Sequence, residues 1–521
     1  CSIQESNDIP KEAIEYLVNP RETELEKHIH RGDVEYLIEV FHDAKEYGSI
    51  LEVKKIDFDA LEKRIEEIRD NVPEDLFELQ YREVILEKIP PLIEQAKIMS
   101  QKYDVVCTNP PYMASKGMNG TLRDFLKKRY ENSKGDLFSV FIEVCINYSS
   151  KNKFVSMITQ HSWMFLVSFE KLRSRILNYN TINSLIHLGT RSFEEIGGEV
   201  VQSVSFVLKK SAIKKFTASY FRLVDYTSSY KKNDAFLIRL CPIYYIRQDS
   251  FEKITGTPIA YWISESFLNC FKRNSKLSTK AFSDGQLLTG NNDKYLRYIW
   301  EVKAQDIKSR RWVLHAKGGE LRKWFGNIEH VVDWSESAKQ HYRNDKIARI
   351  PPEYIWFRKG VVWSGSSSVG NFAVRLLEEN SNFNKAAPTI FLKDNNYLMY
   401  TIGLLNSKFA VELLKIMNPT MYTAINDVLN LPFKEPSREF LLKINKIVGE
   451  CISISRIDWD SFETSWDFKR HSLLKHKKDA ATIEQAFNNW SIFTENQFNQ
   501  LKTNEEELNR IFIEIYGLQD E

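Results

Sequence analysis

Four short apolar segments, separated by amphipathic patterns, constrain the fold of the central part of this chain. They are expected to be β-strands: Tyr103–Cys107, Phe154–Thr159, Ile182–Leu188 and Val200–Leu208. Helical patterns at Leu137–Tyr148 and Phe169–Leu177 separate the first three, which predicts a doubly wound α/β sheet with crossover helices. The connection Gly189–Glu199 is too short for a third crossover helix, so the last two strands are predicted to pair antiparallel.

The tetrapeptide Asn109-Pro110-Pro111-Tyr112 follows the first of these strands, which we expect to be buried. Two successive prolines hold the backbone extended and remove two N–H donors, so the loop offers a carboxamide, carbonyl oxygens and an aromatic ring. A primary amine on a flat heterocycle, such as that of adenine, fits this set. The Asn109 side-chain oxygen and the Pro110 carbonyl would accept its two N–H bonds, and Tyr112 would stack on the ring. The alternative is a rigid strand-to-loop exit without a binding role.

This loop is one of six ordered segments between Tyr103 and Lys210 that together resemble a known family. The segments are Asn109-Pro-Pro-Tyr-Met113, Ser115-Lys-Gly-Met118, Gly135-Asp-Leu-Phe138, Ile158-Thr-Gln-His-Ser-Trp-Met164, Phe169-Glu-Lys-Leu-Arg173 and Gly198-Glu-Val-Val-Gln202. In this order they resemble the second half of the catalytic domain of adenine-modifying DNA methyltransferases, in particular the PglX family of the BREX phage-defence systems.

The resemblance implies S-adenosylmethionine-dependent methylation of adenine N6 in double-stranded DNA, with Asn109, Pro110, Pro111 and Tyr112 as the catalytic loop. Enzymes that modify a base flip it out of the duplex, and Tyr112 would form one stacking face for it. The resemblance makes Phe193 the candidate for the second face, with a core position at a strand end as the alternative. It also makes Asp136 a candidate cofactor contact, although Asp136 could equally cap the helix that follows it.

Methyltransferases of this kind also carry a glycine-rich strand exit for the cofactor, and no such segment is found between Cys1 and Asp104. Gly32 and Gly48 are the only glycines there, and each is isolated. We therefore expect an incomplete S-adenosylmethionine site, with the first half of the sheet outside this chain and no activity for the 521 residues alone.

Charge is distributed unevenly along the chain. Residues from Cys1 to Asp104 include 26 acidic and 14 basic side chains, a net charge of −12, and because the whole chain carries +2 the remainder carries +14. A basic surface is what phosphate binding requires, although solvated side chains give the same excess. The nearest basic cluster to the loop is a candidate DNA contact or a solvated helix face. It consists of Lys116, Arg123, Lys127, Lys128 and Arg129.

Four regions are predicted. Residues 1–102 are expected to be a helical insertion, in which Phe58, Leu61, Ile65 and Ile68 recur at helical spacing and Pro90-Pro91 ends the last helix. Residues 103–215 are expected to be the C-terminal half of the catalytic domain. The fold class is thus α/β, a partial Rossmann-like methyltransferase sheet with a helical insertion, followed by a mixed α+β target-recognition region and a C-terminal helical segment.

Residues 216–450 are expected to recognise DNA, because several glycine turns carrying polar residues resemble the target-recognition region of the same enzymes. These turns are Thr289-Gly-Asn-Asn-Asp293, Lys317-Gly-Gly-Glu-Leu-Arg-Lys-Trp324, Trp363-Ser-Gly-Ser366 and Gly403-Leu-Leu-Asn-Ser407. Asn291, Arg322 and Ser366 are the candidate DNA contacts, and a packing or turn role is the alternative for each. Residues 451–521 are expected to be helical, with Phe487 and Phe498 on apolar positions.

The remaining composition limits the compartment and the kind of site. No apolar stretch reaches the ~18 residues of a membrane span and no leader is recognised, so a cytoplasmic protein without a membrane partner is expected. The six cysteines form no CxxC pair, which indicates reduced, mostly buried thiols and no metal site. Double-stranded DNA is the expected partner, with other phage-defence proteins as further candidates.

Two classes of function remain open. The first is a site-specific DNA adenine N6-methyltransferase that marks host DNA as self in phage defence. The second is a DNA-binding specificity module that no longer methylates, or the methyltransferase-specificity part of a restriction-modification enzyme. The intact Asn109–Tyr112 loop favours the first, and the missing glycine-rich segment favours the second.

Overall fold

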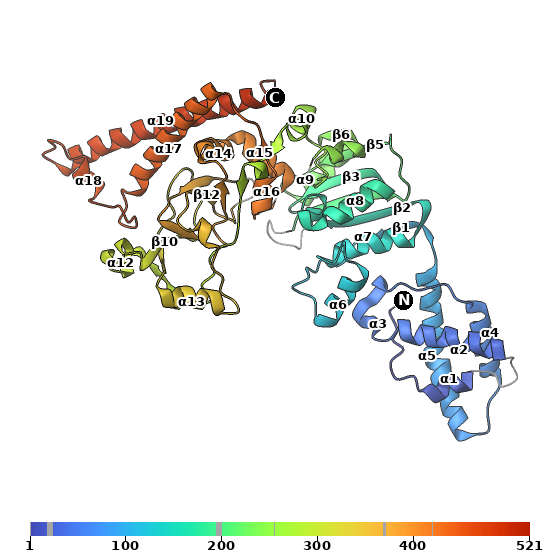
Figure 1. Ribbon diagram of the computed structural model, residues 1–521. Helices are drawn as coiled ribbons and strands as arrows, with labels where there is room; N and C mark the ends of the chain where they lie inside the picture. The colour runs from blue at the N-terminus through green and yellow to red at the C-terminus, as the bar shows by residue number, and fades with distance from the viewer. Residues whose placement is uncertain are drawn as a thin grey trace. The chain divides into compact units, whose positions relative to one another are not determined.

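The computed structural model describes residues 2–17, 24–193, 201–254, 256–367, 371–418 and 420–520, and for residues 24–30 the backbone alone. The chain divides into two compact units, Cys1–Ser250 and Phe251–Glu521, each with its own hydrophobic cores (Figure 1). Within the described ranges, no helix combines the length and the apolar character that crossing a membrane requires.

The first unit begins with a cluster of helices. These are α1 (Lys11–Leu17), α2 (Glu24–Val40), α3 (Ala44–Tyr47), α4 (Phe58–Asp70) and α5 (Leu76–Ser100). The four residues predicted at helical spacing in α4 are all buried, which confirms that helix. The predicted break at Pro90-Pro91 is wrong, because α5 continues through both prolines. Each proline removes one backbone hydrogen bond, and burial of Leu92, Ile93 and Met99 in the shared helical core offsets this cost.

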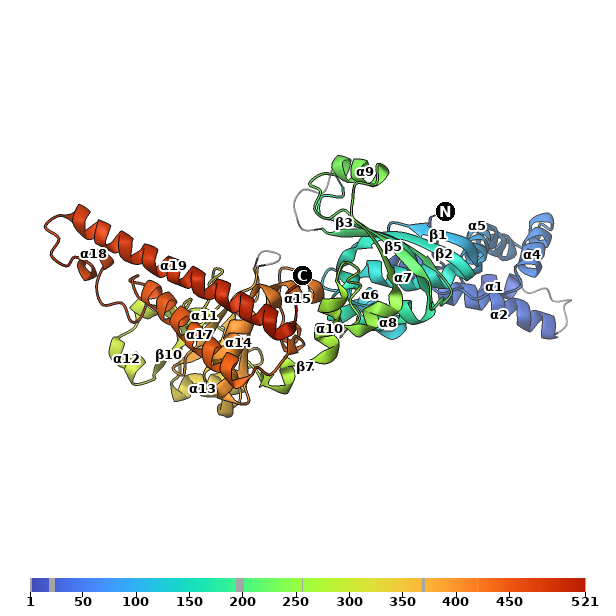
Figure 2. The ribbon, with the colours of Figure 1, turned by 90° about the horizontal axis from the view of Figure 1, so that it is seen from above.

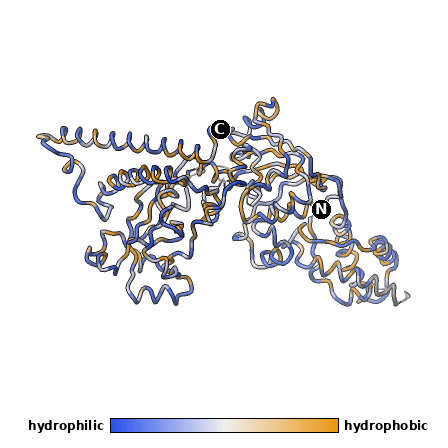
Figure 3. Tube along the Cα trace, turned by 45° about the horizontal axis from the view of Figure 1, so that its top comes forward, coloured by the Kyte–Doolittle hydropathy of each residue, from blue (hydrophilic) through white to orange (hydrophobic). Residues whose placement is uncertain are grey.

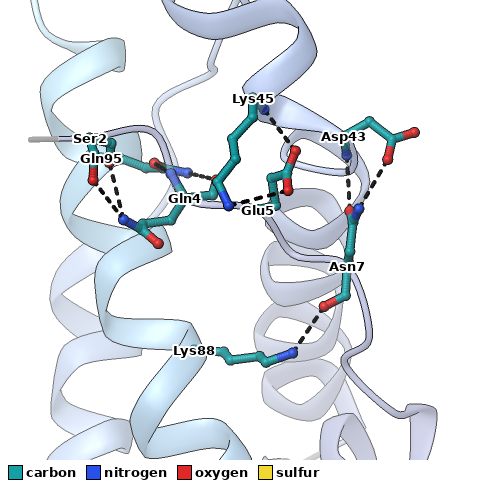
Figure 4. Close-up of polar contacts among 8 residues, drawn as sticks. All are labelled: Ser2, Gln4, Glu5, Asn7, Asp43, Lys45, Lys88 and Gln95. Atoms are coloured by element: carbon teal, nitrogen blue, oxygen red, sulfur yellow. Dashed lines mark hydrogen bonds and ion pairs between the residues drawn. The ribbon is translucent and has the colours of Figure 1, made fainter.

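The residues before α1 are bound to this helical cluster by a set of polar contacts (Figure 4). The Gln4 N–H donates to Gln95 Oε1 at 2.9 Å, and Gln95 Nε2 donates to the Gln4 carbonyl at 3.0 Å. The Asn7 side chain exchanges two 3.0 Å hydrogen bonds with Asp43, and Lys88 Nζ donates to the Asn7 carbonyl at 3.0 Å. Residues 2–7 therefore lie across α5 and the start of α3 as a fixed part of the first unit.

Six described strands of the first unit form one mixed sheet in the order β1-β2-β4-β3-β5-β6. Figure 2 shows this sheet, with β1, β2, β3 and β5 labelled. Their bounds are β1 (Tyr103–Thr108), β2 (Ser149–Gln160), β3 (Thr181–Gly189), β4 (Ser203–Lys209), β5 (Thr217–Arg222) and β6 (Ile243–Arg247). Strands β1 and β2 are parallel, and β3 and β4 pair antiparallel as predicted. The predicted fourth strand includes Val200, which lies outside the described residues. Strands β5 and β6 extend the sheet beyond the four predicted strands.

Four helices accompany this sheet: α6 (Gly120–Arg129), α7 (Leu137–Tyr148), α8 (Glu170–Tyr179) and α9 (Ser229–Leu237). Helix α7 has the predicted bounds and contacts β1 and β2. It joins β1 to β2, and α8 joins β2 to β3, so both predicted crossover helices are present. The observed class is therefore a mixed α/β fold.

Strand β1 lies at the edge of the sheet, and the expectation that it is buried is wrong. Val105 is 62% exposed, and Cys107 is the exposed one among the five described cysteines. In the described part of the chain β1 pairs with β2 on one side and with no strand on the other. A run of apolar residues predicts that a strand is buried, but it does not show which segment of the protein buries it.

The described residues of the second unit form three sheets, with strand orders β14-β10-β11-β9, β13-β12-β15-β8 and β16-β7. The strands are β7 (Ser275–Lys276), β8 (Ala281–Phe282), β9 (Leu296–Tyr298), β10 (Trp312–Ala316), β11 (His330–Asp333), β12 (Gly360–Trp363), β13 (Val374–Leu377), β14 (Ser381–Phe383), β15 (Thr389–Leu392) and β16 (Pro432–Phe433). The helices are α10 (Glu265–Arg273), α11 (Asn292–Tyr295), α12 (Ala304–Lys308), α13 (Glu336–Asn344), α14 (Leu398–Asn406), α15 (Lys408–Met417), α16 (Ile425–Leu429), α17 (Arg438–Trp459), α18 (Ser472–Lys475) and α19 (Ile483–Tyr516).

The segment Gly403-Leu-Leu-Asn-Ser407, expected to be an exposed glycine turn, is instead the buried end of α14. A Cβ at Gly403 would lie 2.9 Å from Val448 Cγ2, so glycine permits the close approach of α14 and α17. The Asn406 side chain bonds both the N–H and the carbonyl of Val374 at 2.9 and 3.0 Å. These residues hold the core of the second unit together.

Helix α19 lies within the predicted C-terminal helical segment, and two of the predicted apolar positions, Phe487 and Phe498, are exposed. Hydrophilic and hydrophobic residues alternate along its whole trace (Figure 3). Its buried apolar residues are mostly in the last third and include Leu508, Ile511 and Phe512. In the first half of α19, Trp490 and Phe493 are half-buried.

Candidate functional site

The loop Asn109–Tyr112 leaves the carboxyl end of β1, where Thr108 pairs with Met157 of β2. The Asn109 side chain is exposed, Pro110 is buried and Tyr112 is half-buried. The Tyr112 ring meets the edge of Phe138 at 6.1 Å between centroids and 79° between planes. Phe138 is fully buried at the start of α7, so it supports the tyrosine ring from a fixed position.

Asp136 fixes the end of this loop. Its Oδ1 accepts hydrogen bonds from the N–H of Met113 at 3.0 Å and of Phe138 at 3.4 Å, and the Leu137 N–H donates to the Met113 carbonyl at 3.0 Å. Burial raises the pKa of Asp136, while the backbone N–H bonds lower it. Asp136 is thus the N-cap of α7 and ties that helix to the residue after Tyr112. Whether it also contacts a cofactor stays a prediction.

The phenol of Tyr112 is close to Ser203, the first residue of β4. Burial raises the pKa of Tyr112, and the Ser203 hydroxyl opposes this shift. Neither oxygen has a partner at standard hydrogen-bond geometry in the described residues. The Tyr112 hydroxyl oxygen is therefore a buried polar group without a hydrogen-bond partner among the described residues.

Phe193, the predicted second stacking residue, follows β3 and is half-buried. No ring contact joins Phe193 to Tyr112 in the described part of the chain. The segment immediately after it, residues 194–200, lies outside the described residues and includes Gly198, Glu199 and Val200 of the family resemblance. A role for Phe193 in stacking stays a prediction.

The basic residues after the loop divide into two groups. Lys116 and Lys128 are exposed and make no ion pair in the residues that the structure describes. Lys127 pairs with Asp124 at 2.9 Å. Arg123 Nη2 donates to the Met118 carbonyl at 2.8 Å, while its Nε has no partner among the described residues. The side-chain nitrogens of Lys116 and Lys128 are therefore available to bind phosphate.

The three candidate DNA contacts of the second unit also differ in whether their polar groups already have partners in the structure. Asn291 is exposed, but its Oδ1 caps α11 by accepting from Lys294 N–H at 3.1 Å. Arg322 donates to the Phe325 carbonyl at 3.0 Å, pairs with Asp458 and lies 5.0 Å above the Trp459 ring. Ser366 is exposed beside a backbone bridge to Tyr422. DNA contact stays a prediction for all three, and the contacts of Arg322 favour a packing role.

Two buried histidines near the strand ends were not predicted. His161 Nδ1 lies 2.9 Å from His187 Nε2, and both residues are buried. Burial lowers the pKa of His161 to about 4 and that of His187 well below its usual range. Arg173 of α8, also buried, donates to the carbonyls of Trp163 at 2.9 Å and Leu166 at 2.5 Å. The sequence offered one signal for Arg173, which is a charged residue on the apolar face of a predicted helix.

No group of three or more His, Cys, Asp and Glu side chains in the described ranges is placed to hold a metal ion.

Comparisons with known proteins give consistent results. The family model described as Eco57I restriction-modification methylase matches residues 23–193. The chain is 38% identical to the adenine-specific methyltransferase PglX of Lacticaseibacillus casei (strain Zhang) over 95% of its length, and 35% identical to the adenine-specific methyltransferase BrxX of Escherichia coli O9:H4 (strain HS) over 92%. It spans 43% and 39% of the lengths of these two relatives.

The fold is similar to the solved structure of the Type IIL restriction-modification enzyme MmeI in complex with DNA. The TM-score is 0.50 at 12% sequence identity, with 80% of this chain and 54% of that chain covered.

Proposed function

This chain belongs to the family of the adenine-specific methyltransferases PglX and BrxX, and we propose that the polypeptide containing it is a site-specific DNA adenine N6-methyltransferase. In this proposal S-adenosylmethionine is the methyl donor, and the modification marks host DNA as self in phage defence of the BREX type. One observation carries the proposal. The loop Asn109–Tyr112 presents an exposed carboxamide and a supported aromatic ring at the carboxyl end of β1.

The proposal includes a fold assignment, in which the sheet is the second half of a Rossmann-like methyltransferase sheet. Support comes from the parallel pair β1 and β2, the antiparallel pair β3 and β4, and the unpaired edge of β1. Ligands bind beyond the carboxyl ends of strands in such sheets, where the loop lies. The sheet continues past residue 215 to Arg247 in β6, so the catalytic region is proposed to extend to that strand. The target-recognition region and the helical segment 451–521 follow it.

In the proposed reaction, residues of this chain bind the amine and the ring of the target adenine. With the target base flipped out of the duplex, Asn109 Oδ1 and the Pro110 carbonyl accept the two N–H bonds of the amine. This favours the geometry in which the nitrogen lone pair points away from the ring system, and it stabilises the positive charge that develops on nitrogen. Tyr112 stacks on the base from the position that Phe138 supports. No general base is required for this step.

The residues of this chain do not complete a site for S-adenosylmethionine. Asp136 is the candidate contact, and its Oδ1 is occupied by two backbone N–H groups, which leaves one carboxylate oxygen. The described residues before β1 are helices and loops without a glycine-rich strand exit. We therefore assign this chain the adenine side of the site and derive no step on the cofactor side.

The test is Asn109→Ala in the natural polypeptide, with N6-methyladenine in host DNA mapped by long-read sequencing. Loss of one preorganised hydrogen-bonding group typically reduces the rate by about 100-fold or more, so methylation should fall below detection while specific DNA binding is retained. Asn178→Ala is the matched control, since Asn178 is an exposed asparagine on α8 and should leave methylation unchanged. Full methylation by Asn109→Ala would disprove the catalytic assignment.

The second candidate function is a DNA-binding specificity module without methylation. In that case the intact gene leaves no modified adenine in host DNA, while the protein still binds a defined DNA sequence.

A further inference from the structure

A row of polar and aromatic side chains crosses one sheet of the second unit. Backbone pairing puts Asn382 of β14 opposite His315 of β10, and His315 opposite His330 of β11. It also puts His330 opposite Tyr298 of β9. Directly paired residues lie on the same face of a sheet, so these four side chains form one continuous row.

The row is the point at which the apolar core of this face ends. One level further along the same strands, the paired positions are Val313, Val332 and Leu296, and all three are buried in one apolar cluster. A set of four polar or aromatic residues beside such a core is costly unless each polar group has a partner. The composition of the row therefore points to a use other than packing.

Burial decreases along the row from one end to the other. Asn382 and His315 are each 2% exposed, and Asn382 Nδ2 and His315 Nδ1 have no hydrogen-bond partner in the described part of the chain. His330 is half-buried, and Tyr298 is 42% exposed. The row thus runs from unsatisfied buried groups to the surface.

The surface end of the row opens into a hollow of about 510 Å³. It is lined by, among others, Tyr298, Lys317, Gly318, Gly319, Glu329 and His330. Gly318 and Gly319 have φ values of +94° and +114°, and a Cβ on Gly318 would lie 2.8 Å from the Ala386 carbonyl oxygen. Glycine is required there, and the two N–H groups make no hydrogen bond to any described residue.

A fixed aromatic pair stands beside the hollow. The rings of Tyr298 and Trp300 are stacked at 4.6 Å and 8°, and Trp300 is 56% exposed. The other neighbour of Tyr298 is His330, at 4.6 Å between ring centroids. The Tyr298 N–H donates to Glu301 Oε2 at 2.6 Å, which holds this segment in place. A rigid, exposed aromatic surface next to open donors is typical of a binding site.

The chemistry of the hollow fits base edges better than phosphate. It combines the backbone of Gly318 and Gly319 with two cationic side chains, the His330 imidazole and two carboxylates; the cations are Lys317 and Arg322, and the carboxylates are Glu320 and Glu329. A phosphate site would exclude the carboxylates, whereas base edges in a groove present both donors and acceptors. We propose that this hollow and the Tyr298–Trp300 pair contact base edges of the duplex target and determine one or two positions of the recognition sequence. The proposal rests on the proposed function.

The experiment uses the natural polypeptide and duplexes in which each base pair of the mapped methylation sequence is changed in turn. Wild-type protein should lose about 10-fold or more in affinity for each changed position that it recognises. His330→Ala and Trp300→Ala should reduce this discrimination to less than about 3-fold at one or two positions and retain it at the others. Lys317→Ala removes the ammonium group of the same hollow, so it should also reduce discrimination at one of these positions rather than weaken binding to all sequences alike.

Two control variants distinguish the loss of a DNA contact from a general loss of the folded structure. Trp300→Phe keeps an aromatic ring and should restore most of the discrimination. Phe487→Ala removes an aromatic residue of the same unit that is 52% exposed and packs edge-on to Trp490, and it should have no effect. If wild type discriminates and both His330→Ala and Trp300→Ala discriminate equally well, this proposal is wrong. If wild type neither methylates nor discriminates, the proposed function fails and this proposal with it.

Discussion

At the scale of single residues, the buried His161–His187 pair makes the first unit sensitive to pH. One ring donates an N–H and the other accepts it across the 2.9 Å contact, so the accepting ring must be uncharged. Burial favours the uncharged form, which lowers the pKa of His161 to about 4. Protonation of either ring would place a charge among buried groups, and protonation of the accepting nitrogen would also break the hydrogen bond.

We predict that the first unit becomes less stable as the pH falls from 6.5 towards 4. In the unfolded chain these histidines bind protons near 6.5, whereas folded His161 remains neutral down to about 4. The stabilisation is therefore complete above pH 6.5 and is lost as the pH falls through this range, by up to about 3 kcal/mol for His161. Urea unfolding at several pH values measures the slope.

The variant His161→Gln, alone and with His187→Gln, should flatten this slope. His42→Gln is the control, since the His42 side chain is 63% exposed and its replacement should leave the slope unchanged. An unchanged slope in the double variant would contradict the prediction.

At this scale the sequence alone supports a prediction only where a residue acts through its own groups. Asn109, Pro110 and Tyr112 carry the acceptors and the ring of the proposed chemistry themselves, so their combination could be interpreted directly. The His161–His187 contact joins residues 26 positions apart on either side of β4, and it depends on the insertion of β4 between β2 and β3. No local pattern predicts such a pairing.

At the scale of elements, the N-terminus of α7 holds the proposed catalytic loop. Asp136 bonds the Met113 N–H on one side and caps α7 on the other, so helix and loop are fixed by one carboxylate. A small displacement of a reacting group can reduce a rate by about 100-fold, which makes this connection important although it is outside the tetrapeptide.

We predict that Asp136→Ala lowers methylation at least about 10-fold and lowers stability by about 1–2 kcal/mol. Asp75→Ala is the matched control, because Asp75 also caps a helix through two backbone N–H bonds, at 2.9 and 3.0 Å, in α5. It should lower stability similarly and leave methylation unchanged. Asp136→Asn keeps an acceptor and should retain most activity. Equal methylation by the two alanine variants would refute a positioning role.

Elements were predictable where side-chain periodicity alone decides the structure. Helices α4 and α7 follow their apolar spacing. Helix α5 does not, because tertiary burial on both sides of Pro90-Pro91 outweighs the local preference to end there. The turn Lys317–Trp324, which lines part of the hollow beside Tyr298, was expected to contact DNA. The hollow itself was not predicted, since it depends on the register of four strands that are far apart in the sequence.

At the scale of the whole molecule, the sheet of the first unit has one free edge next to the proposed site. Val105 is exposed on β1, and β1 has no partner on its outer side in the described residues. A free apolar edge favours pairing with a further segment. The proposed site has its adenine side in this chain and lacks a glycine-rich strand exit for a cofactor.

We therefore predict that the isolated 521-residue chain binds S-adenosylmethionine more weakly than about 1 mM, because the groups that would hold the donor are missing from it. Calorimetry with the purified chain measures this, and binding of duplex DNA by the same preparation shows that the protein is folded. The natural polypeptide is the positive control and should bind the cofactor. A micromolar dissociation constant for the isolated chain would contradict the prediction and would mean that helices α1 to α5, together with Asp136, form a cofactor site without a glycine-rich loop.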